Sequence, residues 1–192
     1  MTSSRSSSSA LILAGGKATR LGGIAKHEIV VSGATIFERQ TRVLAPRVAE
    51  ILVATARDLA GYRCVRDVIE GGGPLAGIAA GLAAMTTPWL LVVAGDMPHL
   101  TGEVVDEILA AAVGDAVGVT VGGLPEPLVC LLHARTRGAV TRRLEAGRYK
   151  ASGLLTDEAL DVRWLALDDH ASAFCNVNEP KDLGDVDGSK PA

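Results

Sequence analysis

A short stretch near the start of the chain combines glycines and cations in a spacing that suits a polyphosphate ligand. It reads LILAGGKATRLGGIAK, from Leu11 to Lys26, and its cations are Lys17, Arg20 and Lys26. Glycine lets the backbone approach a ligand closely, and successive backbone N–H groups in such a loop form a concavity that binds anions. Arginine binds phosphate through a planar fork of donors, and lysine acts as a point charge. The stretch therefore predicts a buried strand that runs into a nucleotide-binding loop.

The glycine and lysine spacing differs from that of two well-known nucleotide loops. A P-loop needs Gly-Lys-Ser/Thr at the start of a helix, but Lys17 is followed by Ala18. The dinucleotide fingerprint needs other glycine positions. Glycine turns and surface lysines are common in proteins that bind no nucleotide. The prediction therefore depends on the whole pattern, LAGG-x-x-x-R-x-G-x-x-x-K, and not on one residue of it.

A second candidate for chemistry is the acid that follows an apolar run at residues 89–94. This run, WLLVVA, has the uninterrupted apolar character of a central parallel strand with both faces covered, and it leads into Gly95-Asp96-Met97-Pro98. Ligands of open α/β sheets bind outside the carboxyl ends of the strands. Magnesium takes one or two carboxylates together with substrate phosphates, so Asp96 is a candidate ligand. The alternative is an ordinary strand-end turn, because Asp and Pro both favour turns.

Strand-like and helix-like segments alternate along the rest of the chain. A capping box at Thr35–Glu38 predicts a helix that ends near Pro46. Thr101 is predicted to cap another helix, and Gly147 to end a helix that starts at Thr136. The other expected strands are residues 51–54, 64–69, 117–121, 128–132 and 162–167, and the other expected helices are residues 75–85 and 153–160. This alternation predicts an α/β fold, a three-layer α/β/α sandwich around a largely parallel, Rossmann-like sheet.

Length and composition favour one globular domain. The chain has 192 residues and an apolar fraction of 48%, enough for a core of Ala, Val, Leu and Ile. Six of the first nine residues are serine, and the last residues of the chain are polar. We expect a disordered tail at residues 1–9, a single domain at residues 10–184 and a polar tail at residues 185–192.

Charge, hydropathy and cysteine content argue against several classes of function. A net charge of −3 supplies no basic patch for nucleic acid. No apolar run reaches the ~18 residues that a membrane span needs. Cys64, Cys130 and Cys175 are odd in number and far apart, as expected of reduced thiols in the cytoplasm. We therefore expect a cytoplasmic protein that binds neither nucleic acid nor membrane.

Four short blocks of sequence, taken together, are typical of one enzyme family. They are LAGG-x-x-x-R-x-G-x-x-x-K, GPLAGI at residues 73–78, GDMP at residues 95–98 and NVN-x-P-x-DL at residues 176–183. With these blocks in this order, the chain resembles the molybdenum cofactor guanylyltransferase family. The first and third blocks occur in many nucleotidyltransferases, whereas the second and fourth are far narrower. The resemblance covers residues 11–183 and implies a single domain with the nucleotidyltransferase fold.

The resemblance also implies a reaction. GMP would be transferred from GTP to the phosphate of the molybdenum cofactor, molybdopterin, with release of pyrophosphate and with Mg²⁺ as the metal. Both reactants are phosphate anions, so catalysis requires charge neutralisation and alignment more than acid–base chemistry. Transient contact with other cofactor-biosynthesis proteins is a further expectation.

Roles for individual residues follow from the same resemblance. The nucleotide-binding residues would be Leu13, Ala14, Gly15, Gly16, Lys26, Leu75 and Asp96, and the residues that meet the pterin substrate would be Asn176 and Asn178. Arg20, Lys26 and Asp96 would form the catalytic set. Lys26 would neutralise the α-phosphate, Arg20 the departing pyrophosphate, and Asp96 would hold Mg²⁺. Leu75 is expected to wall the base.

Three positions depart from the family's pattern. Ala25 precedes the motif lysine where an acid is usual, and Ala54 follows the second strand where an asparagine is usual. Before GPLAG the family has an aspartate on a longer loop, and here Glu70-Gly71 occupies a shortened link. Two of these changes concern guanosine binding. The loss of a hydrogen-bonding group can reduce the discrimination between nucleotides by large factors. Cytidylyl transfer from CTP therefore stays open as an alternative to guanylyl transfer.

Other classes of function stay open on the sequence alone. The three departures are compatible with a non-catalytic nucleotide-binding protein, whereas Arg20, Lys26 and Asp96 favour an enzyme. A sugar-1-phosphate nucleotidyltransferase shares the first block, but we do not expect it to carry GPLAG together with NVN-x-P. Magnesium-dependent release of pyrophosphate distinguishes an enzyme from a binding protein.

Overall fold

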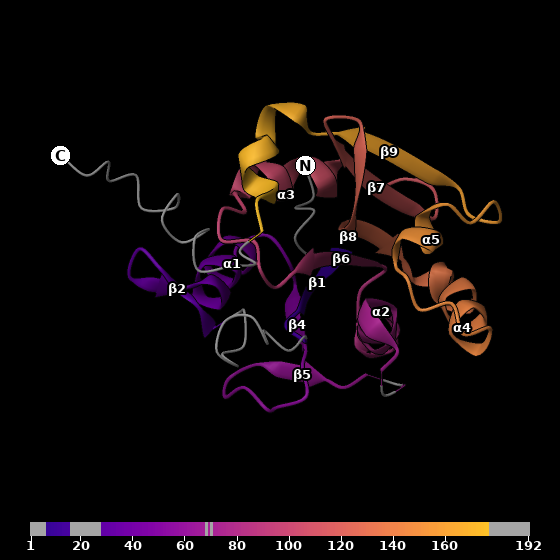
Figure 1. The fold of residues 1–192 in the computed structure, drawn as a ribbon, viewed down its shortest axis with the longest axis horizontal. Coiled ribbons are helices and arrows are strands. Elements are labelled where there is room, and N and C mark those ends of the chain that lie inside the picture. Colours follow the sequence, from indigo (N-terminus) through magenta and orange to yellow (C-terminus); the bar gives the residue numbers. More distant parts are fainter. Residues whose placement is uncertain (1–6, 16–27, 68, 70, 177–192) are drawn as a thin grey trace.

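A seven-stranded sheet with the order β5-β4-β1-β6-β8-β7-β9 forms the centre of the protein (Figure 1). The computed structural model describes residues 7–15, 28–67, 69 and 71–176. The strands of the sheet are β1 (Ser8–Leu13), β4 (Glu50–Ala54), β5 (Arg63–Val65), β6 (Trp89–Ala94), β7 (Ala116–Val121), β8 (Leu124–His133) and β9 (Val162–Ala166). A separate hairpin contains β2 (Val30–Val31) and β3 (Ala34–Thr35). The helices are α1 (Ile36–Leu44), α2 (Gly73–Ala84), α3 (Gly102–Ala110), α4 (Arg137–Glu145), α5 (Ser152–Leu155) and the 3-10 helices η4 (Ala134–Thr136) and η5 (Asp168–Phe174).

Parallel pairing dominates the sheet, as predicted. β1 is parallel to β4 and β6, β4 is parallel to β5, and β7 is parallel to β9. β8 is antiparallel to both of its neighbours, β6 and β7. The expectation that residues 89–94 form a parallel strand is therefore correct on the β1 side and wrong on the β8 side. The carboxyl ends of β1, β4, β5 and β6 share one edge of the sheet, which is called the carboxyl edge below.

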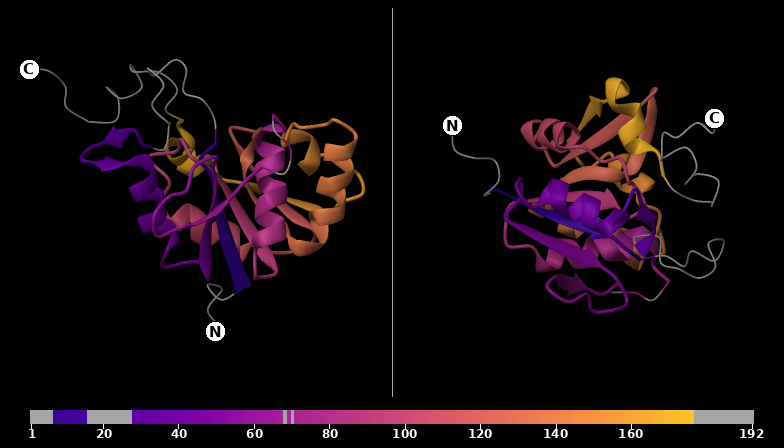
Figure 2. Two further views of the ribbon diagram at one scale, coloured as in Figure 1. Left: turned by 90° about the horizontal axis from the view of Figure 1, so that it is seen from below. Right: turned by 90° about the vertical axis from the view of Figure 1, so that its left-hand side faces the viewer.

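Side chains of the central strands alternate between two cores, one on each face of the sheet. In β1, Ala10 and Ile12 belong to the core that contains residues of α1 and α3, and Leu11 belongs to the core that contains residues of α2, α4 and α5. In β6, Leu91 belongs to the first of these cores and Leu90 to the second. Figure 2 shows helices on both sides of the sheet. The three-layer α/β/α sandwich is confirmed, and covering both faces explains the continuous apolar run in β6.

Local capping signals place the helix ends where the sequence predicts them. In α1, the Thr35 hydroxyl accepts a bond from the Glu38 amide at 3.1 Å, and the Glu38 carboxylate accepts one from the Thr35 amide at 2.8 Å. The Thr101 hydroxyl accepts a bond from the amide of Val104 at the start of α3. Gly147, with a φ of +69°, follows the end of α4. This left-handed conformation favours glycine and stops the helix.

Several element boundaries differ from the prediction because pairing partners decide where a strand ends. β5 stops at Val65, since Ala54 at the end of β4 is its last partner. β8 starts at Leu124, four residues before the expected start, in a register that shifts between Gly118 and Thr120 of β7. The helix expected at residues 153–160 is only the short α5. The hairpin β2–β3 and the helix η5 are additional to the prediction.

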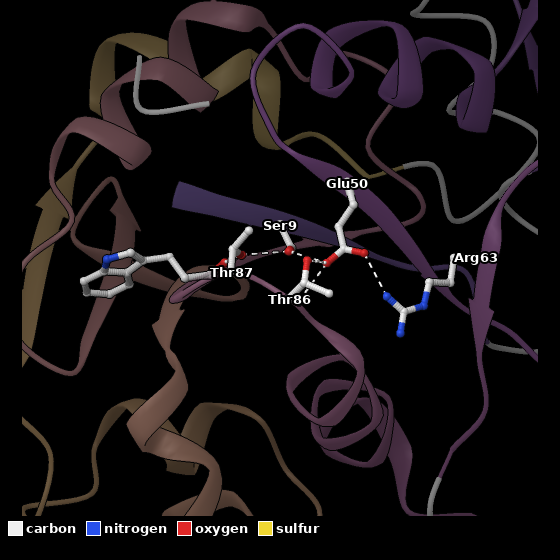
Figure 3. A network of polar contacts seen from close by, with 6 residues as sticks. Ser9, Glu50, Arg63, Thr86 and Thr87 are labelled. Carbon is white, nitrogen blue, oxygen red and sulfur yellow. Dashed lines mark hydrogen bonds and ion pairs between the residues drawn. The ribbon is translucent and has the colours of Figure 1, made fainter. Parts of the chain in front are cut away.

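The serines before Ala10 are part of the fold, so the boundary of the predicted disordered tail at residue 9 is wrong. Ser8 and Ser9 lie in β1 and are 2% and 0% exposed. The Ser9 hydroxyl donates to the Glu50 carboxylate at 2.8 Å and also bonds the Thr87 hydroxyl (Figure 3). Partners far along the chain therefore satisfy a polar residue that local sequence places in a tail. Residues 1–6 and the polar tail at 185–192 lie outside the described residues.

The remaining physical expectations concern membranes and thiols. Among the described residues, no helix has the length and apolarity to cross a membrane. All three cysteines are free thiols, with Cys130 buried, Cys64 half-buried and Cys175 exposed.

Candidate active site

The ends of β1 and β6 meet at the carboxyl edge through backbone contacts. The Gly95 amide donates a hydrogen bond to the Leu13 carbonyl at 3.1 Å, and the Ala14 amide donates to the Ala54 carbonyl at 3.0 Å. A Cβ atom on Gly95 would lie 2.6 Å from the Leu13 oxygen and 3.2 Å from Ala14 Cα. Only glycine permits this approach, because real Cβ contacts are longer. The turn that carries Asp96 is therefore held against the start of the glycine loop.

Asp96 directly follows Gly95 and is half-buried at this edge. Its carboxylate is a hard oxygen donor of the type that Mg²⁺ prefers. The described part of the chain contains no group of three His, Cys, Asp or Glu side chains that could enclose a metal. Magnesium usually binds one or two carboxylates, substrate phosphates and water, so the position of Asp96 fits such an ion.

The first residues of the glycine loop pass from the core to the surface. Leu13 is half-buried, Ala14 is 8% exposed, and Gly15 is exposed. Backbone atoms at Gly15 are thus accessible beside Asp96. The predicted site residues that lie outside the described residues are Gly16, Arg20, Lys26 and Asn178.

Leu75 is a buried residue of α2, and its expected contact with the base stays a prediction. It lies in the first turn of α2, is 0% exposed and belongs to the core under that helix. Helix α2 carries Pro74 in its first turn, and the burial pattern of the helix directs Leu75 toward the sheet. The main chain of this turn is what remains near the surface.

Helix α2 packs very closely on the ends of β1 and β4. A Cβ atom on Gly77 would lie 3.1 Å from Ala54 Cβ, 3.2 Å from Leu13 Cδ2 and 3.3 Å from Asp67 Oδ1. One glycine thus marks the point where the ends of β1 and β4 and the segment after β5 meet. Sequence blocks that lie about 60 residues apart are brought together here.

Asp67 is a carboxylate at the carboxyl edge that sequence reasoning missed. It follows β5 and is exposed, but the protein on one side of its carboxyl reduces hydration and raises its pKa. Its carboxylate makes no hydrogen bond or ion pair with any described residue. The rule that identified Asp96, an acid just after a strand, applies equally to Asp67. Because the expected strand continues to residue 69, the sequence places Asp67 inside that strand and not after it.

Glu126 is a second acid near this edge that the sequence did not single out. The last residues paired between β6 and β8 are Val92 and Cys130, and β8 begins six residues before Cys130, on the side of the β6 carboxyl end. Glu126 is half-buried in this extension, and burial raises its pKa. Because the predicted strand began at residue 128, Glu126 lay in an expected loop.

Asn176 is exposed and lies two residues after the end of η5. Ala173 and Phe174, at the end of η5, belong to the same core cluster as Met97 and Ala14. In Figure 2 (left), η5 (yellow) and the β2–β3 hairpin lie at the end of the molecule opposite the start of β1. The last described residues of the chain are thus anchored on the side of the sheet where β1 and β6 end.

Together, this sheet and its carboxyl edge define the protein as an α/β nucleotidyltransferase in fold class. Two solved structures share the fold. A molybdopterin-guanine dinucleotide biosynthesis protein A from Archaeoglobus fulgidus has a TM-score of 0.77 and 24% identity, over 93% of this chain and 96% of that one. A 2-C-methyl-D-erythritol 4-phosphate cytidylyltransferase from Thermus thermophilus has a TM-score of 0.71 and 21% identity, over 93% and 96%.

The chain belongs to the MobA-like NTP transferase family, whose domain model matches residues 10–162. A molybdenum cofactor guanylyltransferase from Pseudomonas putida (strain F1) is 31% identical over 96% of this chain and 100% of its own length. One from Shewanella sp. (strain MR-4) is 33% identical over 90% of this chain and 91% of its own length. The family resemblance read from the four sequence blocks is thereby confirmed.

Proposed function

We propose that this protein transfers GMP from GTP to the phosphate of the molybdenum cofactor and releases pyrophosphate. The observation that carries the proposal is the contact between Gly95 and Leu13, which holds Asp96 beside the start of the glycine loop. Full-length similarity to relatives named molybdenum cofactor guanylyltransferase supports the choice of substrates.

The chain's own residues would bind, orient and neutralise the two phosphate reactants. Asp96 would hold Mg²⁺, which when bound supplies charge for phosphate oxygens and for the leaving pyrophosphate. Backbone amides from Gly15 onward would bind phosphate oxygens, with Arg20 and Lys26 as the cations of the loop. The acceptor phosphate is ionised at neutral pH, so alignment and charge neutralisation are sufficient and no general base is needed. Asn176 and Asn178 would meet the pterin.

Asp67 would supply the base contact that Ala54 lacks. Guanine presents two adjacent donors, N1–H and the 2-amino group, and an ionised carboxylate only accepts hydrogen bonds. A Cβ atom on Gly77 would contact both the Ala54 Cβ and the Asp67 Oδ1, so Asp67 lies close to Ala54 at the carboxyl edge. Cytosine presents one amino donor on the corresponding edge and would be bound less well. This geometry supports GTP over CTP as the nucleotide.

Thermal unfolding with each nucleotide tests the ligand. GTP, CTP, ATP and UTP would each be added with and without Mg²⁺. A ligand at one hundred times its Kd adds about 2.7 kcal/mol to the free energy of unfolding. We expect the largest shift with GTP and Mg²⁺. A shift that is selective for CTP would favour cytidylyl transfer over the proposed guanylyl transfer.

Pyrophosphate release with the cofactor as acceptor tests the reaction. Asp96→Ala is expected to abolish the Mg²⁺-dependent release, and Asp106→Ala is the matched control, because Asp106 pairs with Arg47 on the outside of α3. Absence of release in the parent protein would contradict the proposal and favour a non-catalytic nucleotide-binding protein. Undiminished release by Asp96→Ala would show that Asp96 is not the metal ligand.

A further inference from the structure

Gln40 is a fully buried amide whose two bonds go to the turn that carries Asp96. It lies on α1 and is 0% exposed. Its Nε2 group donates to the Ala94 carbonyl at 2.6 Å and to the Met97 carbonyl at 3.3 Å. These two carbonyls stand on either side of Gly95-Asp96. The amide orientation follows from chemistry, because the opposite one would place Oε1 against two carbonyl oxygens.

The neighbours of Gln40 on the same face of α1 are apolar. Ile36 and Leu44, one turn before and one turn after it on α1, are both 0% exposed, so the three residues form one buried stripe. The Gln40 Oε1 atom is buried and has no hydrogen-bond partner among the described residues. A buried acceptor without a partner is costly. An apolar residue of similar shape would complete the stripe without that cost.

The turn is therefore held from two sides. On the sheet side, the Gly95 amide donates to the Leu13 carbonyl at 3.1 Å. On the helix side, Gln40 holds the carbonyls before and after Asp96. Four consecutive residues then have their backbone positions fixed, and the direction of the Asp96 side chain is set by that backbone.

We propose that Gln40 is a positioning residue, which orients the Asp96 carboxylate for the metal–nucleotide complex by fixing the turn from Ala94 to Met97. The proposal rests on the function proposed above. Gln40 itself touches neither metal nor substrate. Its contribution is to keep the carboxylate in one direction before the metal arrives.

The test compares Gln40→Met with Thr41→Val. Methionine keeps the unbranched shape but loses both donors. Thr41 is the matched control because it is also buried on α1, and its hydroxyl bonds only Phe37 and Glu38 carbonyls within the helix among the described residues. Three measurements are made on each protein: amide hydrogen exchange of residues 93–100 without metal, Mn²⁺ affinity by electron paramagnetic resonance with GTP present, and the KM for GTP in turnover at saturating Mg²⁺.

We expect Gln40→Met to exchange faster at residues 93–100 and to bind Mn²⁺ about tenfold more weakly, the usual effect of losing an outer partner of a metal ligand. The KM for GTP at saturating Mg²⁺ should stay within about twofold of the parent, since the phosphate loop is untouched. Thr41→Val should match the parent in all three measurements.

Three outcomes overturn the inference. If the parent turns over and Gln40→Met matches Thr41→Val, Gln40 has no positioning role and the proposed function stands. If the parent shows no Mg²⁺-dependent turnover, the proposed function fails and the inference fails with it. Gln40→Leu, which continues the stripe of Ile36 and Leu44, is the second variant if Gln40→Met does not fold. Loss of folding in both would make Gln40 a purely structural residue and would also overturn the inference.

Discussion

The amide of Gly95 donates a 3.1 Å hydrogen bond to the carbonyl of Leu13, where a side chain on Gly95 would have no space. This contact joins the first and third of the four sequence blocks, which lie about 80 residues apart. We therefore expect Asp96 and the start of the glycine loop to meet the same ligand. The chemistry of a metal–triphosphate complex requires that proximity.

Gly95→Ala should reduce the activity of the protein more than the stability of its fold. The added Cβ would meet the Leu13 oxygen at 2.6 Å, so the turn must move. A displacement of about 1 Å in a positioned group can cost about a hundredfold in rate, and we expect kcat/KM to fall by that order. Gly138→Ala in α4 is the control, because its Cβ would meet only the end of the flexible Arg142 side chain, at 3.4 Å. Equal activity of the two variants would contradict the assignment of the active site to this edge of the sheet.

Asp67→Asn should reduce selectivity for GTP. Loss of one hydrogen bond to a charged group costs about 1.5–3 kcal/mol, so we expect Kd for GTP to rise by roughly tenfold or more while Kd for CTP changes little. Isothermal titration with both nucleotides measures this. Asp58→Asn is the control, since Asp58 is exposed and paired with Arg66. A parallel loss for GTP and CTP would exclude Asp67 as a guanine contact.

The same carboxylate predicts a pH dependence of GTP binding. Reduced hydration raises the pKa of Asp67 above its usual value. GTP affinity needs the ionised form, so it should begin to fall at a higher pH than for an ordinary aspartate as the solution is acidified. Asp67→Asn should remove this part of the pH profile. A profile that is identical in parent and variant would argue against the assignment.

Glu50 should stabilise the fold without taking part in the reaction. Burial raises its pKa, but hydrogen bonds from the Thr86 amide and hydroxyl, the Ser9 hydroxyl and Arg63 outweigh burial and lower it (Figure 3). We expect Glu50→Ala to reduce the free energy of unfolding by about 1–3 kcal/mol, because the buried Ser9 hydroxyl and the Thr86 donors lose their acceptor. Urea unfolding measures the change, and Glu158→Ala, an exposed residue on the surface, is the control.

The stabilisation by Glu50 should also depend on pH. Its pKa is lower in the folded than in the unfolded protein, so its contribution is fully present above the unfolded value and is lost as the pH falls through the folded value. The difference in unfolding free energy between parent and Glu50→Ala should therefore shrink on acidification. The kcat of the variant should equal that of the parent, since Glu50 starts β4 and lies at the opposite edge of the sheet from Asp96.

Cys130 should resist thiol reagents in the folded protein. Its burial raises the pKa of the thiol to about 12, so the reactive thiolate is scarce and inaccessible. Cys175 is exposed and should react first with iodoacetamide at mildly alkaline pH, as mass spectrometry of the labelled peptides would show. Modification of Cys130 at the rate of Cys175 would indicate that β8 opens readily.

Local sequence signals account for the α/β class, the helix caps and the strand before Asp96. The capping box at Thr35 and the apolar run of β6 involve only neighbouring residues, and their structures match the prediction. Asp96 could be found because its strand is continuous and its turn is short. Such features depend on backbone geometry and burial within one segment, which adjacent residues specify.

Contacts between distant segments determine which parts of the chain meet and which side chains they bury. The antiparallel direction of β8, the burial of Ser9 against Glu50 and the burial of Leu75 depend on partners far along the chain. Asp67 and Gln40 became candidates only when the ends of β4, β5 and β6 were placed next to α1 and α2. A hydrogen bond or a close glycine contact is a property of two segments together. The sequence of either segment alone therefore determines neither.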